Sequence, residues 1–224
     1  LPVLVLILRS RGSIKPLRDL PLPHVALALA IGSLGGCAYY LCYYSSLLFT
    51  NVSVAVTLNY LYPIFTVLFM ELLAGMRLPP ARVLAGLAVC FSGAFLIISR
   101  GGSATWQWNW GIILAATAAA VWGVFSALAR KYQFDPVLIV TLGSATGTAI
   151  PFLVLRFSGN LPYPGLEGLL GFIYLGTVPI ALGVMMWLKA LNLAEPAHIA
   201  GLIYFTPFLA MIVAAKVLGE HAGT

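Results

Sequence analysis

The chain has 224 residues, of which 61% are hydrophobic and only 8% are charged, and its formal net charge is +6. A soluble globular domain carries about 25% charged residues, so this composition excludes a protein surrounded by water on all sides. The basic residues lie mostly at the ends of long apolar runs, which is typical of membrane topology and not of a nucleic-acid-binding surface. We therefore expect the lipid bilayer as a partner and no nucleic acid.

The first apolar run, residues 1–8, is too short to cross a bilayer. Basic residues follow this run, whereas in a signal peptide they would precede it. The chain also begins on Leu1 and not on Met. We interpret the run as the end of a longer span, and we expect the chain to be a fragment.

Seven longer apolar runs follow, each close to the roughly 20 residues that a helix needs to cross the hydrocarbon core. Open strand edges cannot be paired in lipid, so these runs predict helices. The sequence therefore predicts an all-α integral membrane protein. The predicted spans are 25–49, 54–73, 83–99, 111–129, 136–155, 168–188 and 196–215.

Basic residues between the spans indicate the orientation of the bundle. One side carries Arg9, Arg11, Lys15, Arg18, Arg77, Arg82, Arg130, Lys131 and Lys189, and the other carries Arg100, Arg156 and Lys216. Cytoplasmic loops of membrane proteins are enriched in Lys and Arg, so the first set is expected in the cytoplasm.

A Tyr-x-x-Pro motif occurs twice, at Tyr60–Pro63 and at Tyr204–Pro207, which are 144 residues (207 − 63) apart. The same shift superposes Gly32 on Gly176 and Gly75 on Gly219. Four predicted spans separate the two motifs, so the helices that carry them cross the membrane in opposite directions. This arrangement predicts inverted repeats, which secondary transporters use to form a solute site near mid-membrane.

Longer motifs surround these positions. The first half contains Leu58-x-Tyr60-Leu61-x-Pro63 and the turn Gly75-x-Arg77-Leu78, and the second half contains Trp122-Gly123, Leu175-Gly176-Thr177, Met186–Leu191, Pro196–Ala200, Pro207 and Leu218–Glu220. In this order and spacing, the motifs resemble the EamA-type domains of the drug/metabolite transporter superfamily. The resemblance covers nearly the whole chain.

The resemblance implies a helical bundle of two inverted five-helix repeats. On this ten-helix template the chain is truncated to about seven full spans plus a stub. The first repeat would cover 1–100, truncated at its N-terminus, and the second 101–224, truncated at its C-terminus. Met76 departs from the pattern, because the family usually has Glu at this position and at that of Glu220.

Polar and aromatic side chains inside the predicted spans are candidates for a solute cavity, because they need polar partners at membrane depth. Each proline also frees a backbone carbonyl one turn earlier, here that of Asn59 or Ile203. The alternative for each tyrosine and for Asn59 is helix packing or an interhelical hydrogen bond, and for Lys189 and His198 an interfacial position. The predicted cavity residues are Tyr40, Tyr43, Asn59, Tyr60, Pro63, Trp122, Tyr204 and Pro207, with Tyr44, Thr66, Lys189 and His198 as a secondary set.

The sequence contains no ATP-binding loop and no arrangement of His and Cys that suits catalysis or zinc. We expect no enzyme, no cofactor and no metal site. The resemblance implies a multi-pass secondary transporter of the inner (plasma) membrane that exports a small-molecule solute, such as an amino acid, by alternating access. A monomer and a homodimer are both compatible with the sequence.

Two other functions stay open: a sugar-phosphate or nucleotide-sugar exchanger of the same superfamily, and a membrane enzyme or scaffold. An exchanger of anions should carry several Lys or Arg near mid-membrane. In this sequence Lys189 and Lys216 lie at span ends. The pattern favours a neutral or zwitterionic solute.

The charge bias generates a testable topology. In a variant without the native cysteines, single cysteines at Gly12 and Ala81 should react with an impermeant maleimide only from the cytoplasm, and one at Gly159 only from outside. Labelling of the Gly12 and Gly159 sites from the same side would contradict the predicted spans.

Overall fold

A computed structural model of the chain describes residues 21–100, 108–159 and 164–217, and the regular structure in these ranges is entirely helical. This confirms the predicted all-α class. The helices are α2 (Leu22–Ser33), η2 (Leu34–Ala38), α3 (Tyr39–Ser46), α4 (Val52–Asn59), α5 (Tyr62–Ala74), α6 (Ala81–Arg100), α7 (Trp110–Lys131), α8 (Pro136–Phe157), α9 (Leu166–Leu175), η3 (Gly176–Leu182), α10 (Gly183–Leu193), α11 (Pro196–Ile203) and α12 (Thr206–Val217), with η2 and η3 being π-helical turns.

Six helical segments in the described part of the chain are long and apolar enough to cross a membrane: Leu22–Ser46, Val52–Ala74, Trp110–Lys131, Pro136–Phe157, Leu166–Leu193 and Pro196–Val213. They coincide with six of the seven predicted spans. The seventh, 83–99, is a helix too, but its apolar part, Ala81–Leu96, is shorter than the other six. The seventh predicted span thus corresponds to α6, Ala81–Arg100, which is a helix of 20 residues. The predicted stub and Glu220 lie outside the described residues.

Local sequence signals set several of these helix ends. The side chains of Asn51 and Asp135 accept hydrogen bonds from the backbone N–H groups of Val54 (2.9 Å) and Val137 (2.7 Å), and so cap the starts of α4 and α8. Gly75 ends α5 with a φ of 70°, a left-handed conformation that glycine adopts without a steric penalty.

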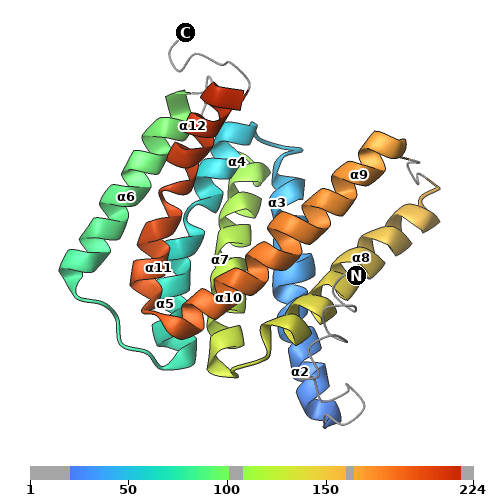
Figure 1. Ribbon diagram of the computed structural model, residues 1–224, viewed down its shortest axis with the longest axis horizontal. Helices are drawn as coiled ribbons and strands as arrows, with labels where there is room; N and C mark the ends of the chain where they lie inside the picture. Colours follow the sequence, from blue (N-terminus) through green and yellow to red (C-terminus); the bar gives the residue numbers. More distant parts are fainter. Residues whose placement is uncertain (1–20, 101–107, 160–163, 218–224) are drawn as a thin grey trace.

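Helix boundaries recur at a constant spacing along the chain. α2, α4 and α5 begin at Leu22, Val52 and Tyr62, and α9, α11 and α12 each begin 144 residues later. The turns η2 and η3 also overlap after this shift. In Figure 1, the chain rises from α2 to α3 and descends from α4 to α5, whereas it descends from α9 to α10 and rises from α11 to α12. These boundaries and directions support an inverted relation between the segment α2–α5 and the segment α9–α12. The division into two five-helix repeats stays a prediction.

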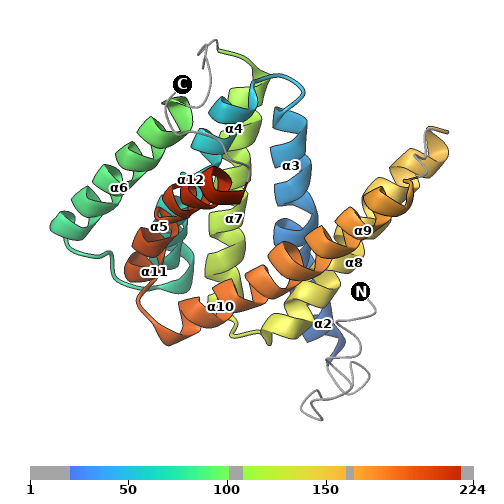
Figure 2. The ribbon, with the colours of Figure 1, turned by 45° about the horizontal axis from the view of Figure 1, so that its top comes forward.

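Helix α7 lies at the centre of the bundle and packs against α3, α4, α5 and η2 (Figures 1 and 2). Its buried residues include Ala115, Ala118 and Ala119, which have no exposed surface. Small side chains let neighbouring helices approach closely, which is the main source of helix association in lipid. The alanine-rich sequence of α7 therefore explains its central place.

A second close contact joins the first span to α8 through glycines. A Cβ atom on Gly32 would lie 2.7 Å from the carbonyl oxygen of Ile139. A Cβ atom on Gly36 would overlap the carbonyl of Gly143, and one on Gly147 would overlap the carbonyl of Gly36. These glycines form two Gly-x-x-x-Gly pairs, Gly32 with Gly36 and Gly143 with Gly147, and both pairs lie at the contact between the two helices.

This contact predicts that Gly147→Ala destabilises the protein, because the added methyl group must push the two helices apart. We expect a loss of about 1–3 kcal/mol, which is typical of overpacking. Gly93→Ala on α6 is the matched control, since a Cβ atom there meets no atom within 4 Å. Thermal unfolding in detergent should show a lower Tm for Gly147→Ala alone. Equal midpoints for the two variants would contradict the contact.

Candidate functional site

Six aromatic side chains meet where α3, α5, α7 and α10 come together. The ring of Tyr39 lies 4.8 Å from that of Trp122 and 6.1 Å from that of Tyr43, measured between centroids. Tyr62 lies edge-on to both Trp122 (6.1 Å) and Trp187 (5.8 Å). Such distances are those of favourable aromatic pairs. We call this set the aromatic cluster: Tyr39, Tyr43, Tyr62, Trp122, Phe125 and Trp187.

Two polar atoms in and beside the aromatic cluster are buried without a hydrogen-bond partner among the described residues. Asn59, the last residue of α4, donates from Nδ2 to the hydroxyl oxygen of Tyr39 at 3.1 Å, but its Oδ1 has no donor. The indole Nε1–H of Trp122 has no acceptor, although the side chain is only 9% exposed. An unpaired buried group costs about 1–3 kcal/mol, so these two atoms require an explanation.

Other buried polar groups nearby are satisfied within the protein. The Nε1–H of Trp187 donates to the hydroxyl of Ser126 at 2.9 Å, and Thr66 donates to the carbonyl of Tyr62 at 2.8 Å. Thr66 was in the secondary set of cavity residues, and its hydroxyl is engaged by its own helix. The unpaired atoms of Asn59 and Trp122 are therefore a local exception.

A second feature lies where two helices are interrupted. α4 ends at Asn59 and α5 begins at Tyr62, while α11 ends at Ile203 and α12 begins at Thr206. The hydroxyl of Tyr204 donates to the backbone carbonyl of Tyr60 at 3.0 Å, and the two rings are 6.4 Å apart. The sequence predicted freed carbonyls at Asn59 and Ile203, and that stays a prediction; the bond from Tyr204 reaches the carbonyl of Tyr60, the first residue after α4.

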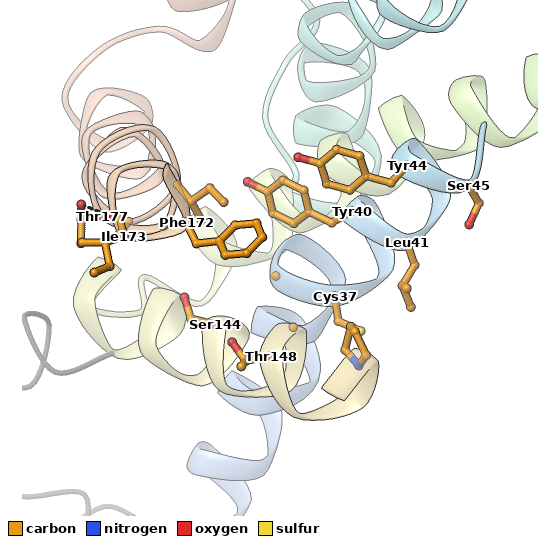
Figure 3. Close-up of a pocket in the computed structure, with 16 residues that line it drawn as sticks. Cys37, Tyr40, Leu41, Tyr44, Ser45, Ser144, Thr148, Phe172, Ile173 and Thr177 are labelled. Carbon is orange, nitrogen blue, oxygen red and sulfur yellow. Dashed lines mark hydrogen bonds between the residues drawn. The ribbon is translucent and has the colours of Figure 1, made fainter. Parts of the chain in front are cut away.

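The third feature is a groove of about 810 Å³ between α3 with η2, α8, and α9 with η3. Figure 3 shows Tyr40 and Tyr44 on one wall, Ser144 and Thr148 on another, and Phe172 on a third. None of the described residues that line it is charged. Both π-helical turns contribute to the walls, and such turns are frequent at functional sites.

The structure distributes the predicted cavity residues over these three features. Tyr43, Asn59 and Trp122 lie in or beside the aromatic cluster. Tyr60, Tyr204, Pro63 and Pro207 lie at the helix interruptions, and Tyr40 and Tyr44 line the groove. Lys189 and His198 have exposed side chains, and neither lines the groove.

Sequence reasoning left out three residues that the structure places at the centre of the cluster: Tyr39, Tyr62 and Trp187. A signal for Tyr39 existed, because Tyr39 and Tyr43 are four residues apart and so share a helix face. Tyr62 lies inside the Tyr-x-x-Pro motif and Trp187 inside the motif Met186–Leu191, but neither motif indicates the direction of a side chain.

Comparison with known proteins gives a consistent result. A family model described as "EamA-like transporter family" matches residues 1–99 and 109–224. The chain is 30% identical over 207 residues to a protein of Streptantibioticus cattleyicolor named "Probable terminal-alkyne amino-acid exporter", with 91% of this chain and 67% of that protein covered. It is 27% identical over 188 residues to "Aromatic amino acid exporter YddG" of Ancylobacter novellus, with 82% and 64% covered. The chain thus spans about two thirds of the length of these relatives.

A solved crystal structure has the same fold. It superposes on this chain with a TM-score of 0.82 at 23% sequence identity, and the match covers 99% of this chain and 76% of the solved one. At this level of identity the likeness bears on the fold alone.

Proposed function

Since the chain belongs to the EamA-like transporter family, we propose that it exports small organic metabolites, foremost amino acids, across the inner membrane by alternating access. It is a multi-pass membrane transporter. Two relatives with exporter names support the solute class, one of them named for aromatic amino acids.

The observation that carries this proposal is the pair of unpaired polar atoms within an aromatic environment. Oδ1 of Asn59 and Nε1 of Trp122 are buried beside aromatic rings, and no described charged side chain takes part in the ring contacts of the cluster. A solute with a neutral or zwitterionic polar part can pair with such atoms. A sugar phosphate or nucleotide sugar would need cationic partners, and none lines the groove in its described walls.

The groove fits the same solute class. Its volume of about 810 Å³ is within the range of small-molecule sites, which is roughly 300–1,000 Å³. Tyr40 lines the groove, and its ring contacts that of Tyr39 at 4.8 Å, so the groove and the aromatic cluster lie on two sides of one helix. Solute passing between them would move along the tyrosines of α3.

Alternating access has a physical basis in the bond between the two helix interruptions. Tyr60 and Tyr204 occupy corresponding positions, 144 residues apart, yet only Tyr204 donates to the other's carbonyl in the described residues. If the two inverted parts exchange conformations during transport, the reciprocal bond forms from the hydroxyl of Tyr60 to the carbonyl of Tyr204. Each bond then stabilises one of the two states.

The transport function is tested with the full-length protein in proteoliposomes and a panel of labelled amino acids. Trp122→Ala and Asn59→Ala should each lower the initial rate at least about ten-fold, because each removes a group that pairs with the solute. Trp108→Ala and Asn192→Ala are matched controls, since both side chains are exposed. Absence of any solute transport by the unmodified protein would refute the function, and full activity of both cluster variants would refute the site.

The reciprocal bonds predict opposite effects of two similar variants. Tyr204→Phe removes the observed bond and Tyr60→Phe the reciprocal one, so each should shift the population of states about two- to ten-fold, in opposite directions. The readout is the rate at which an impermeant maleimide labels a single cysteine at Ser144, which lines the groove. Changes in the same direction would contradict the exchange of bonds.

A further inference from the structure

The two unpaired atoms beside the aromatic cluster differ in hydrogen-bonding character. Nε1–H of an indole can only donate, and Oδ1 of an amide can only accept. Both are buried and lack partners among the described residues. A ligand that satisfies both must therefore present an acceptor to Trp122 and a donor to Asn59.

Both atoms are held against the same side chain. Asn59 is oriented by its Nδ2 bond to the hydroxyl of Tyr39, which directs Oδ1 away from that hydroxyl. The indole of Trp122 packs against the ring of Tyr39 at 4.8 Å with an angle of 55° between the planes. Tyr62 and Phe125 contact the same indole at 6.1 and 5.3 Å, so Trp122 is fixed from three sides. Asn59 and Trp122 thus both contact Tyr39, and contacts within the protein hold both side chains.

One chemical group that offers both an acceptor and a donor, with no net charge, is the α-ammonium carboxylate of an amino acid. Its carboxylate accepts from N–H groups, and its ammonium donates. Aromatic faces also attract an ammonium group, which adds to its stabilisation beside the rings of this cluster. A singly charged amine or acid would satisfy only one of the two atoms.

From these contacts we infer that Trp122 and Asn59 recognise the head group of the solute: Nε1–H of Trp122 donates to the carboxylate, and Oδ1 of Asn59 accepts from the ammonium group. Tyr39 is a positioning residue that orients the amide of Asn59. This assignment rests on the proposed function and specifies which atoms distinguish an amino acid from its amine and acid analogues. These two atoms bind only the head group and do not contact the side chain of the solute.

The test is a binding experiment that does not depend on transport. The affinity of the purified full-length protein in detergent is measured for phenylalanine, for phenethylamine, which lacks the carboxylate, and for 3-phenylpropanoate, which lacks the ammonium group. Leucine and serine serve as probes with other side chains. We expect the unmodified protein to bind phenylalanine at least about ten-fold more tightly than either analogue, because hydrogen bonds to charged groups are the strong ones.

Two variants should remove the two halves of this preference separately. Trp122→Phe keeps an aromatic ring but lacks the N–H group. It should lower the affinity for phenylalanine about ten-fold and leave the affinity for phenethylamine unchanged. Asn59→Leu should lower the affinity for phenylalanine by a similar factor and leave the affinity for 3-phenylpropanoate unchanged. Trp108→Phe, at an exposed tryptophan, should alter none of the affinities. Tyr39→Phe keeps both Nε1 of Trp122 and Oδ1 of Asn59. It should therefore lower the affinity for phenylalanine less than Asn59→Leu does.

Several results would overturn the inference. If none of the three amino acids binds, the head group is not the ligand of these atoms, whereas transport of another metabolite would leave the proposed function standing. An equal loss for all three phenyl compounds in both variants would mean that the two atoms pair with water in the protein interior. If Asn59→Leu bound phenylalanine no more tightly than phenethylamine, Asn59 would bind the carboxylate, and the roles assigned to Asn59 and Trp122 would be reversed.

Discussion

Inside the hydrocarbon core of a bilayer no water is available to pair with free backbone groups, so each break in a helix must be compensated by the protein. The described chain has such breaks at Tyr60–Leu61 and at Tyr204–Phe205, each next to a proline in the first turn of the following helix. The hydroxyl of Tyr204 satisfies the carbonyl of Tyr60 across the bundle. The backbone requirement thus links two segments that are 144 residues apart in the sequence.

The same requirement explains why the centre of the molecule is built from small residues. Since lipid gives helices little hydrophobic reason to associate, they are held by close packing. Alanines on α7 and glycines on η2 and α8 allow that approach. With the backbones so close, the few large side chains on the same faces are forced together. Trp122 on α7 is therefore surrounded by rings from α3, α5 and its own helix.

Within this packed region most polar groups are satisfied by the protein, and we propose that the two unpaired atoms bind a ligand. Thr66 and Trp187 find partners in the protein, and their positions are structural. Asn59 and Trp122 keep one unpaired atom each, and the nearest groove is lined by uncharged side chains. A carrier must release what it binds, so a site of single hydrogen bonds and aromatic faces suits transport better than a site of fixed opposite charges would. The polar chemistry and the apolar groove both suit the proposed solute, which has a small polar head and an apolar body.

The amino-acid sequence by itself determined that the chain is a bundle of membrane helices, because span length and hydrophobicity are local properties. It located the predicted spans and the family motifs. Only the tertiary structure decided the partners of the buried side chains. Tyr40 lines the groove and Tyr43 belongs to the aromatic cluster, but Tyr39, which the sequence did not single out, holds Asn59 and contacts Trp122. Successive residues of a helix point about 100° apart. The choice between Tyr39 and Tyr40 therefore depends on how α3 is rotated against α4 and α7, and packing between distant segments sets that rotation.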